Sequence, residues 1–515
     1  MAQRAEATVQ QPEASEPAHI DPSKLTFESP WTRRRIIACY WAVIILALPL
    51  WWKLTSIERL ALPEAQVKSI AAKKWQPRVH IRAQSNTASD SAQTLLQAVS
   101  TQLAARGVAV SPVTAKPAGE DAYEVVITSG GETGATLRGH QATFTIPNKS
   151  SFGSCKDPAD ILSDLLAPPT HCVSGPSNRV VKYAPRYRLA FTLLNEDAAS
   201  GNAAFSWDVL RSIDRFIQPT LDRLNVLHNF TIESQVQYQA PLAFSPVPIE
   251  NREQQVHGLT QEQLTVFVNS AEWTLSSSVS NDPVLHFVLF IPSAKHKPLS
   301  ILDHAGQPSD ANAFILPQWG GIVLLNNPHT HLSSANLLPT FTTFRQQLMA
   351  LLGVPDLPAC VRSADKNSPF TDWQLDALVR RRTAENVKDS QETLQSIVSL
   401  VNQIENMPVG QDVRGDVQGA LDALNQIFAV ESPTLALQHS AEALKLSSRA
   451  FFNPGMLGLL YFPAEHKYAV YTPLFASVAA PLVAAVVREF MAWKRARKEA
   501  QKKLQAGSSD KPKED

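Results

Sequence analysis

The stretch that decides the architecture of this chain is YAVYTPLFASVAAPLVAAVV, residues 468–487, twenty successive residues without a formal charge. At about 1.5 Å of rise per residue, a helix of this length spans about 30 Å, the thickness of the hydrocarbon core of a bilayer. Residues 488–503, which follow, are rich in Lys and Arg. Basic residues beside an apolar span mark its cytoplasmic side, so we expect a transmembrane helix. The alternative is a buried core helix, but core helices rarely run this long without charge.

Pro473 and Pro481 interrupt this segment. Membrane helices tolerate proline where neighbouring helices or local kinks satisfy the freed carbonyl groups. The two prolines therefore favour a helix that packs against other membrane helices.

A second apolar run lies near the N-terminus. Residues 1–30 are rich in Ala, Glu, Gln, Pro and Ser, which predicts a disordered tail. Arg33, Arg34 and Arg35 then precede residues 36–52, seventeen uncharged residues. A cleaved signal peptide is the alternative, but the leader is long and no small-x-small cleavage site follows at once. We expect an uncleaved signal-anchor helix whose N-terminus is cytoplasmic.

Because both basic clusters lie on the outer flanks, the two spans predict a hairpin with both termini in the cytoplasm. Residues 53–467 then lie across the membrane, which in a eukaryotic cell is the lumen of the endoplasmic reticulum. The predicted segments are a disordered tail (1–32), a first transmembrane helix (33–53), a lumenal α/β domain (54–357), a lumenal helical region (358–466), a second transmembrane helix (467–490) and a basic cytoplasmic tail (491–515).

Two kinds of residue fit a lumenal location. Asn148 and Asn229 each begin an Asn-x-Ser/Thr sequon for N-glycosylation. Cys155 and Cys172 flank a polar loop, and a disulfide between them would be permitted in the lumen and would stabilise by about 3 kcal/mol. Cys39 lies within the first span, and Cys360 is then left as an unpaired, buried and inert thiol.

Alternating apolar patterns predict an α/β domain over residues 75–355. Residues 285–291, which contain His286, are too apolar for a half-exposed strand, and this indicates a central strand covered on both faces. A capping box, Thr260 to Gln263, predicts a helix start, and Gly353 a helix end. The strands expected are 78–83, 123–128, 142–146, 186–194, 231–239, 285–291, 313–316 and 321–325. The helices expected are 55–74, 95–104, 207–227 and 341–352, and residues 148–178 are expected to form a polar loop.

Three helices are expected after residue 358. Apolar residues repeat at helical spacing over 373–407 and 413–430, and Ser432-Pro433 begins a third helix. These stripes predict an antiparallel three-helix bundle. The alternative use of the stripes is a partner-binding coiled coil.

Composition and motifs provide no convincing active site. Equal numbers of basic and acidic residues, 47 each, argue against a nucleic-acid binder. There is no phosphate-binding glycine loop and no nucleophile elbow, so no cofactor is expected. His329 and His331, with Asp303-His304, have no further ligand at recognisable metal spacing. The basic run at 380–382 is interpreted as a helix surface facing acidic neighbours or lipid headgroups.

Several motifs, in order, resemble the phosphatidylinositol-glycan class S subunit of GPI transamidase. The resemblance covers both spans and most of residues 285–495, and is thin over 85–280. The motifs are WWK (51–53) with IER (57–59) and LP (62–63), the strand 285–292 with Pro298-Leu299, PQWGGI (317–322), FRQQL (344–348) with Gly353, WQLD (373–376) with RRT (381–383), FFNPGM (451–456) and YFPAEHKYAVY (461–471).

The resemblance implies a non-catalytic subunit of the complex that attaches preassembled GPI anchors to the C-termini of precursor proteins in the endoplasmic reticulum. It implies acyl transfer through a cysteine thioester on a different, protease-like subunit, which is the partner expected here together with membrane lipids. The alternatives are an independent lumenal, membrane-tethered enzyme and a chaperone or cargo receptor.

Overall fold

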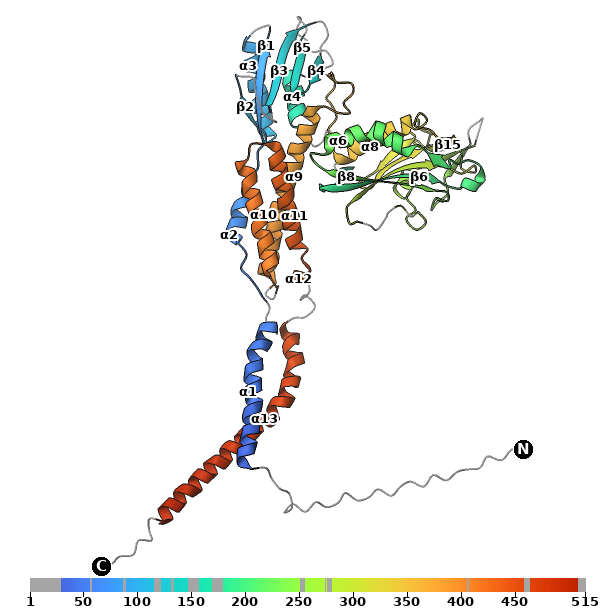
Figure 1. Cartoon of the computed structure of the whole chain (residues 1–515). Helices are drawn as coiled ribbons and strands as arrows, with labels where there is room; N and C mark the ends of the chain where they lie inside the picture. The colour runs from blue at the N-terminus through green and yellow to red at the C-terminus, as the bar shows by residue number, and fades with distance from the viewer. Residues whose placement is uncertain are drawn as a thin grey trace, which may run out of the picture. The chain divides into compact units, whose positions relative to one another are not determined.

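We describe a computed structural model of the chain (Figure 1), which falls into two compact units. The first unit comprises residues 1–60, 405–410 and 454–515, and the second comprises 61–404 and 411–453. The residues described are 29–55, 58–86, 89–114, 122–130, 134–146, 157–168, 179–250, 255–273, 275, 280–404, 407–457 and 464–507.

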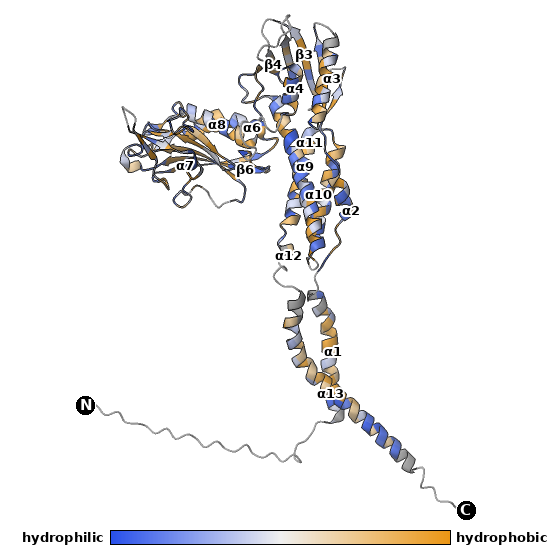
Figure 2. Ribbon diagram, turned by 180° about the vertical axis from the view of Figure 1, so that it is seen from behind, coloured by the Kyte–Doolittle hydropathy of each residue, from blue (hydrophilic) through white to orange (hydrophobic). Residues whose placement is uncertain are grey.

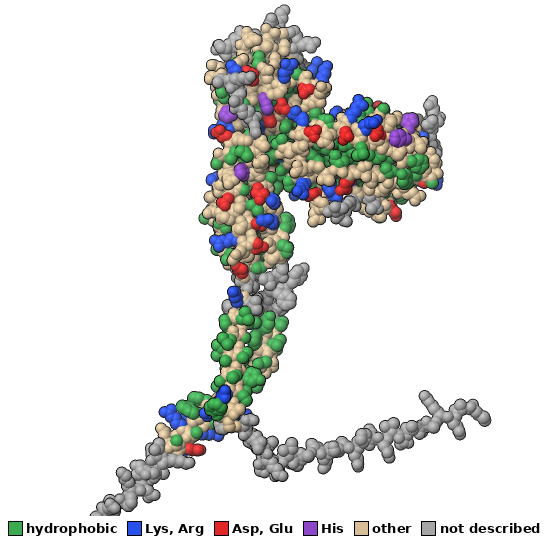
Figure 3. Space-filling view, viewed as in Figure 1, with side chains coloured by type: hydrophobic (Ala, Val, Ile, Leu, Met, Phe, Trp, Pro, Cys, Tyr) green, Lys and Arg blue, Asp and Glu red, His purple; other side chains and the backbone are tan. Residues whose placement is uncertain are grey.

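Two long apolar helices, α1 (Pro30–Thr55) and α13 (Ala464–Gly507), make up most of the first unit. Each contains a segment long and apolar enough to cross a membrane, Trp31–Trp51 and Ala469–Lys502. Hydrophobic side chains gather on the part of the two helices that runs side by side in Figure 3, and α13 turns hydrophilic towards its C-terminal end (Figure 2). The two apolar helices expected near the ends of the chain are therefore present, and α13 continues through Pro473 and Pro481.

The two helices contact each other at both ends. Trp51 packs edge-on against Tyr471 and Phe475, with ring centroids 5.7 and 5.2 Å apart. Near the opposite ends, Arg33 and Arg34 form ion pairs with Glu489. The helices are thus antiparallel, and the basic flanks of both lie at the same end of the pair.

The second unit contains two large sheets, each with its own apolar core, and two smaller ones. The first has the order β16-β4-β5-β3-β1-β2, and helices α3 (Ser89–Ala105) and α4 (Pro158–Leu166) pack with it in one apolar core. Its strands are β1 (Arg78–Ser85), β2 (Ala109–Pro112), β3 (Ala122–Ser129), β4 (Gly134–Arg138), β5 (Gln141–Ile146) and β16 (Val361–Ser363). The last of these comes from the region expected to be helical.

The other sheet has the order β13-β14-β11-β6-β8, with β13 antiparallel to four parallel strands. One face packs against α5 (Val209–Ser212), α6 (Gln218–Leu224) and α8 (Leu338–Leu352), and the opposite face covers a second core around Phe267 and Trp273. The strands are β6 (Arg186–Asn195), β8 (Asn229–Gln237), β11 (Val284–Ile291), β13 (Ala313–Leu316) and β14 (Gly320–Leu324). The prediction of β11 as a central strand is confirmed.

Smaller elements surround this sheet. A three-stranded sheet contains β9 (Val247–Glu250), β10 (Gln255–Leu259) and β12 (Leu299–Ile301). A two-stranded sheet contains β7 (Ser206–Trp207) and β15 (His331–Leu332). The capping box at Thr260 is present, but its helix, α7, is only Gln261–Thr265.

The helical bundle contains α9 (Asp372–Gln403), α10 (Gln411–Ala429) and α11 (Pro433–Phe451), side by side in Figures 1 and 2. Ser432 caps α11 as expected. A fourth helix, α2 (Glu64–Ala71), joins them through Val67 and Ile70, which are buried. The short α12 (Pro454–Leu457) follows in the chain.

Three predicted elements differ from the structure. The helix expected over 55–74 is reduced to α2, which begins after Pro63 at the N-cap. Residues 58–62 are not helical, and Leu60 N donates to Val409 O instead. The expected loop 148–178 contains α4, capped by Asp157. The expected helix 207–227 begins as β7 and contains a π turn at Ile213–Ile217, because Pro219 cannot donate a hydrogen bond within the helix.

Candidate functional site

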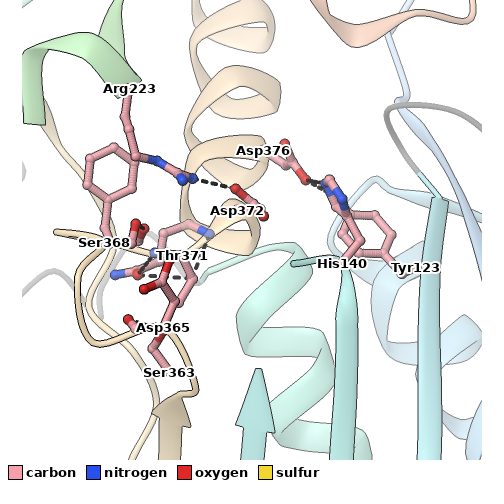
Figure 4. A network of polar contacts seen from close by, with 11 residues as sticks. Tyr123, His140, Arg223, Ser363, Asp365, Ser368, Thr371, Asp372 and Asp376 are labelled. Carbon is pink, nitrogen blue, oxygen red and sulfur yellow. Dashed lines mark hydrogen bonds and ion pairs between the residues drawn. The ribbon is translucent and has the colours of Figure 1, made fainter. Parts of the chain in front are cut away.

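The densest polar network of the described residues surrounds the first four turns of α9 (Figure 4). A capping box starts this helix: Thr371 N donates to Gln374 Oε1 at 2.8 Å, and Gln374 N donates to Thr371 Oγ1. Gln374 also donates to Pro355 O at 2.6 Å. The start of α9 is thus fixed to the chain that leaves α8.

Arg380 and Arg382, two residues apart on α9, point in directions about 200° apart because each residue turns the helix by about 100°. Arg380 is 4% exposed and donates to Leu166 O at 3.1 Å. Arg382 is 2% exposed and donates to Leu352 O at 3.0 Å.

These two carbonyl groups are the last ones of α4 and α8. The final carbonyls of a helix have no partner inside it, and the helix dipole makes that end attractive to a cation. Each arginine therefore caps a helix from a different sheet. The sequence predicted that 380–382 form a helix surface facing acidic neighbours or headgroups. Arg381 and Arg382 do have an acidic neighbour, since both form ion pairs with Glu385, at 2.8 and 2.9 Å. The prediction of a surface is wrong for Arg380 and Arg382, which are buried.

On the side of the first sheet, Asp376 accepts two hydrogen bonds at the same oxygen. Tyr123 Oη lies 2.7 Å from Asp376 Oδ2, and His140 Nε2 lies 2.9 Å from it. Tyr123 also receives a hydrogen bond from Arg380 at 2.8 Å and packs against Trp373, with ring centroids 4.4 Å apart. Figure 4 shows the three side chains of this cluster converging between α9 and the sheet.

On the side of the second sheet, Arg223 of α6 forms an ion pair with Asp372 in the first turn of α9 and lies over the Phe370 ring, 5.2 Å from its centroid. A carboxylate in the first turn also complements the helix dipole. A cavity of about 40 Å³ lies beside this pair. It is too small for an organic ligand, so this side of the network connects elements rather than binding one.

Burial keeps the titratable groups near Arg382 uncharged at neutral pH. The pKa of His228 is lowered to about 4, mainly by burial and also by the nearby Arg382 charge, while the bond to Ala184 O opposes the shift. Burial raises the pKa of Tyr187 to about 12, although Arg382 opposes this. Neither group would exchange protons with a substrate near pH 7, so His228 and Tyr187 fit a structural role rather than acid–base catalysis.

A second polar cluster lies where ligands usually bind in such a sheet. In open α/β sheets that place is the crevice at the carboxyl ends of neighbouring strands where the strand order reverses, here β6 and β11. Glu196, which follows β6, accepts from Ser293 N at 2.7 Å and pairs with His296 Nδ1 at 2.5 Å. Both oxygens of this buried carboxylate thus bond to the chain itself. The ring of His257 lies 5.5 Å from that of His296.

The residues singled out from the sequence have different outcomes. Asn229 and Thr231 are exposed at the start of β8, whereas the Asn148 sequon lies outside the described residues. His304, His329 and His331 are exposed, and no group of three metal-ligating side chains occurs in the described part of the chain. His331 instead bonds to Ser206 Oγ at 2.8 Å.

The cysteine assignments need one correction. Cys39 is free, but Cys360 is disulfide-bonded, so the prediction of an unpaired thiol at Cys360 is wrong. Cys155 and Cys172, the predicted pair, lie outside the described residues. The pairing of Cys155 with Cys172 therefore stays a prediction.

The network around α9 was missed by the sequence reasoning. Tyr123 and Asp376 are 253 residues apart, and no local pattern announces their contact. The one available signal was Thr371-x-x-Gln374, the sequence form of a capping box, which marks the start of α9.

Fold and site together define a class of protein: two α/β sheets and a helical bundle joined by one long helix, with a pair of apolar helices long enough to cross a membrane. The chain matches the family of the phosphatidylinositol-glycan biosynthesis class S protein over residues 38–117 and 154–496, and it belongs to that family.

Named relatives agree with this assignment. The chain is 34% identical to the GPI-anchor transamidase component PIGS of Mus musculus over 362 residues, 67% of this chain and 64% of the mouse protein. It therefore spans less than two thirds of that relative. It is 27% identical to the GPI transamidase component PIG-S homolog of Schizosaccharomyces pombe over 90% of this chain, and 26% identical to the GPI transamidase component GPI17 of Saccharomyces cerevisiae over 87%.

Proposed function

We propose that this chain is a non-catalytic subunit of a GPI transamidase complex, in which it braces the catalytic subunit from the lumenal side of the endoplasmic reticulum membrane. The observation that carries the proposal is the family match over residues 38–117 and 154–496. The names of the relatives describe a component of that complex.

The chemistry of the described cysteines supports a non-catalytic role. Transamidation through a thioester needs a thiolate with a base within hydrogen-bond reach. Cys39 lies in the apolar helix α1, and Cys360 is in a disulfide bond, so neither supplies an activated thiolate. We propose that the reacting cysteine belongs to a protease-like partner subunit.

The organisation of the second unit suits a brace. Arg380 and Arg382 fix two sheets to one 32-residue helix through buried hydrogen bonds. Such a body holds its surfaces in a constant arrangement for partner subunits. The apolar residues exposed on α1 and α13 suit contact with lipids or with other membrane helices.

The proposed topology places both termini in the cytoplasm and residues 53–467 in the lumen, where Asn148 and Asn229 would be glycosylated. Support comes from the pairing of α1 and α13, since Arg33, Arg34 and Glu489 lie at one end and Trp51 and Tyr471 at the other. Basic residues favour the cytoplasmic side, and aromatic residues favour either interface.

Depletion of the chain tests the proposal. We expect reduced surface staining for GPI-anchored proteins, accumulation of uncleaved precursors, and restoration of both by re-expression. A surface protein with its own transmembrane helix is the control and should not change. Normal staining without precursor accumulation would contradict the proposal and favour an independent lumenal enzyme or cargo receptor.

A second experiment tests which subunit reacts. A precursor analogue with an electrophilic carbonyl at the cleavage site should label a cysteine of another chain in the purified complex. Labelling of Cys39, Cys155, Cys172 or Cys360 would overturn the non-catalytic assignment.

A further inference from the structure

A cavity of about 310 Å³ lies within the second unit and shares only Arg380 with the α9 network described above. Two stretches of chain line most of it: one runs from the α2–β1 connection into β1, and the other from the end of α10 into the first turn of α11. This volume is at the lower end of the range for small-molecule sites. The cavity therefore has room for one small organic ligand.

The lining is strongly cationic. Lys74 from the α2–β1 connection, Arg78 from β1 and Arg380 from α9 line the cavity, against a single carboxylate, Glu431. Glu431 is a weak competitor, because its side chain is 84% exposed and lies 4.0 Å from Arg78. Lys74 has no ion pair with any described residue. Lys74 and Arg78 thus bring exposed positive charge to the lining, against one weakly competing carboxylate.

One of these cations is held in a fixed place. Arg380 is 4% exposed, and its hydrogen bonds to Tyr123 Oη and Leu166 O fix the guanidinium group. A buried, pre-positioned guanidinium binds an anion with little further loss of side-chain freedom. The first turn of α11 contributes Pro433 and Ala436 to the lining, which brings the positive end of that helix dipole to the cavity.

The rest of the wall is aromatic or apolar. Trp75 and Phe428 line the cavity beside Ile427, and Lys73 lies over the Phe428 ring, 5.6 Å from its centroid. A ligand with an anionic end and a ring or apolar portion would match this division. A phosphate ester fits better than a carboxylate, since its charge of about −1.5 to −2 corresponds to several convergent cations.

We propose that this cavity binds the phosphate ester of a small ligand, with Lys74, Arg78 and Arg380 around the phosphate and Trp75 and Phe428 against the rest of the molecule. The phosphate ester could belong to a soluble metabolite or to a lipid headgroup. This site is independent of the transamidase assignment, because it rests on the cavity and its charges.

Isothermal titration of the detergent-solubilised full chain with glucose 6-phosphate tests the site. We expect saturable binding, and none with glucose. The double variant Lys74→Ala/Arg78→Ala should weaken binding at least tenfold, since both side chains are exposed and can be removed without disturbing the core. Lys68→Ala is the matched control, an exposed lysine of α2 outside the lining, and should bind within twofold of the wild type.

Dihexanoyl phosphatidate and dihexanoyl phosphatidylcholine form the second arm. Phosphatidate binding tenfold tighter than glucose 6-phosphate supports the site with a lipid headgroup as its source. The reverse order supports it with a soluble ester. The proposal would be overturned if neither glucose 6-phosphate nor dihexanoyl phosphatidate bound. It would also be overturned if the wild type and the double variant, with the same melting temperature, bound equally well.

Discussion

At the scale of single residues, Arg382 is the side chain whose loss should be felt most in the α9 network. It is buried, and its removal leaves Leu352 O, at the end of α8, without its side-chain donor. An unsatisfied buried acceptor costs about 1–3 kcal/mol, and the lost contact to Glu385 adds to this. Arg382→Ala should therefore lower the free energy of unfolding by about 2–3 kcal/mol. Chemical denaturation of the solubilised chain measures it.

Arg381→Ala is the natural control, because Arg381 pairs with the same Glu385 from the next position. Its side chain is 26% exposed, and ion pairs of this spacing contribute only about 0.3–0.5 kcal/mol. Equal losses for the two variants would show that the buried bond to α8 has no special weight.

Histidine burial predicts a stability that depends on pH. The folded-state pKa of His228 is about 4, below its ordinary value of 6.5, because burial disfavours the charged ring. The unfolded chain thus binds a proton more readily, so stability is complete above pH 6.5 and falls as the pH decreases towards 4. One such group should cost about 2 kcal/mol between pH 7 and pH 5. Thermal unfolding across this range measures the slope.

His228→Asn should reduce that slope, because Asn retains a donor for Ala184 O but does not titrate. The slope should not vanish, since burial also lowers the pKa of His286 to about 4, with a further contribution from Arg188. His304→Asn, at an exposed position, should leave the slope unchanged. An unaltered slope in His228→Asn would refute the role of His228.

At the scale of elements, the junction of β14 with β11 depends on the glycine at its start. Gly320 has a φ of +157°, and a Cβ there would lie 1.9 Å from His286 O. Because the obstacle is backbone of the central strand, no side-chain movement relieves it. Gly320→Ala should destabilise by more than about 4 kcal/mol, seen as loss of soluble folded chain.

Gly415 in α10 provides the contrast. No atom lies within 4 Å of a Cβ built there. Ala is favoured over Gly by about 1 kcal/mol inside a helix, so Gly415→Ala should raise stability by about that amount. If both alanine variants behaved alike, close approach would not be the cause at Gly320.

Elements with a strong local pattern were predictable. β11 is apolar except for His286 and is buried along nearly all of its length, and α8 ends at Gly353, whose φ of +76° suits glycine. α9 and α10 follow their apolar stripes. Elements that depend on distant partners were not predictable. β16 pairs with β4 across more than 200 residues, and the burial of Arg380 depends on α4, inside a segment expected to be a loop.

The candidate site was the least predictable part for the same reason. Charged residues on a helix are usually solvated, so the sequence favoured a surface role for 380–382. Burial of Arg380 and Arg382 follows only when two helix ends from different sheets meet α9. Tertiary partners, which local periodicity does not contain, decide between the two interpretations.

At the scale of the whole molecule, the remaining question is on which side of the membrane the body lies. Two helices are apolar enough to span, and their basic flanks lie at the same end of the antiparallel pair. If that end is cytoplasmic, residues 53–467 are lumenal. Protease added to sealed microsomes should then remove tags at both termini and leave the body intact. Digestion of the body before detergent is added would reverse the topology.

Asn229 provides an independent reading of the same question, because N-glycans are added only in the lumen. Asn229 and Thr231 are exposed at the start of β8, an edge strand, so the sequon is accessible. Thr231→Ala should remove a glycan and increase gel mobility, whereas Thr231→Ser keeps the sequon and should not. The difference should disappear after glycosidase treatment. If residues 53–467 were protected from protease but Thr231→Ala did not change the gel mobility, the topology would stand and this sequon would not be used. If residues 53–467 were digested and carried no glycan, they would lie in the cytosol.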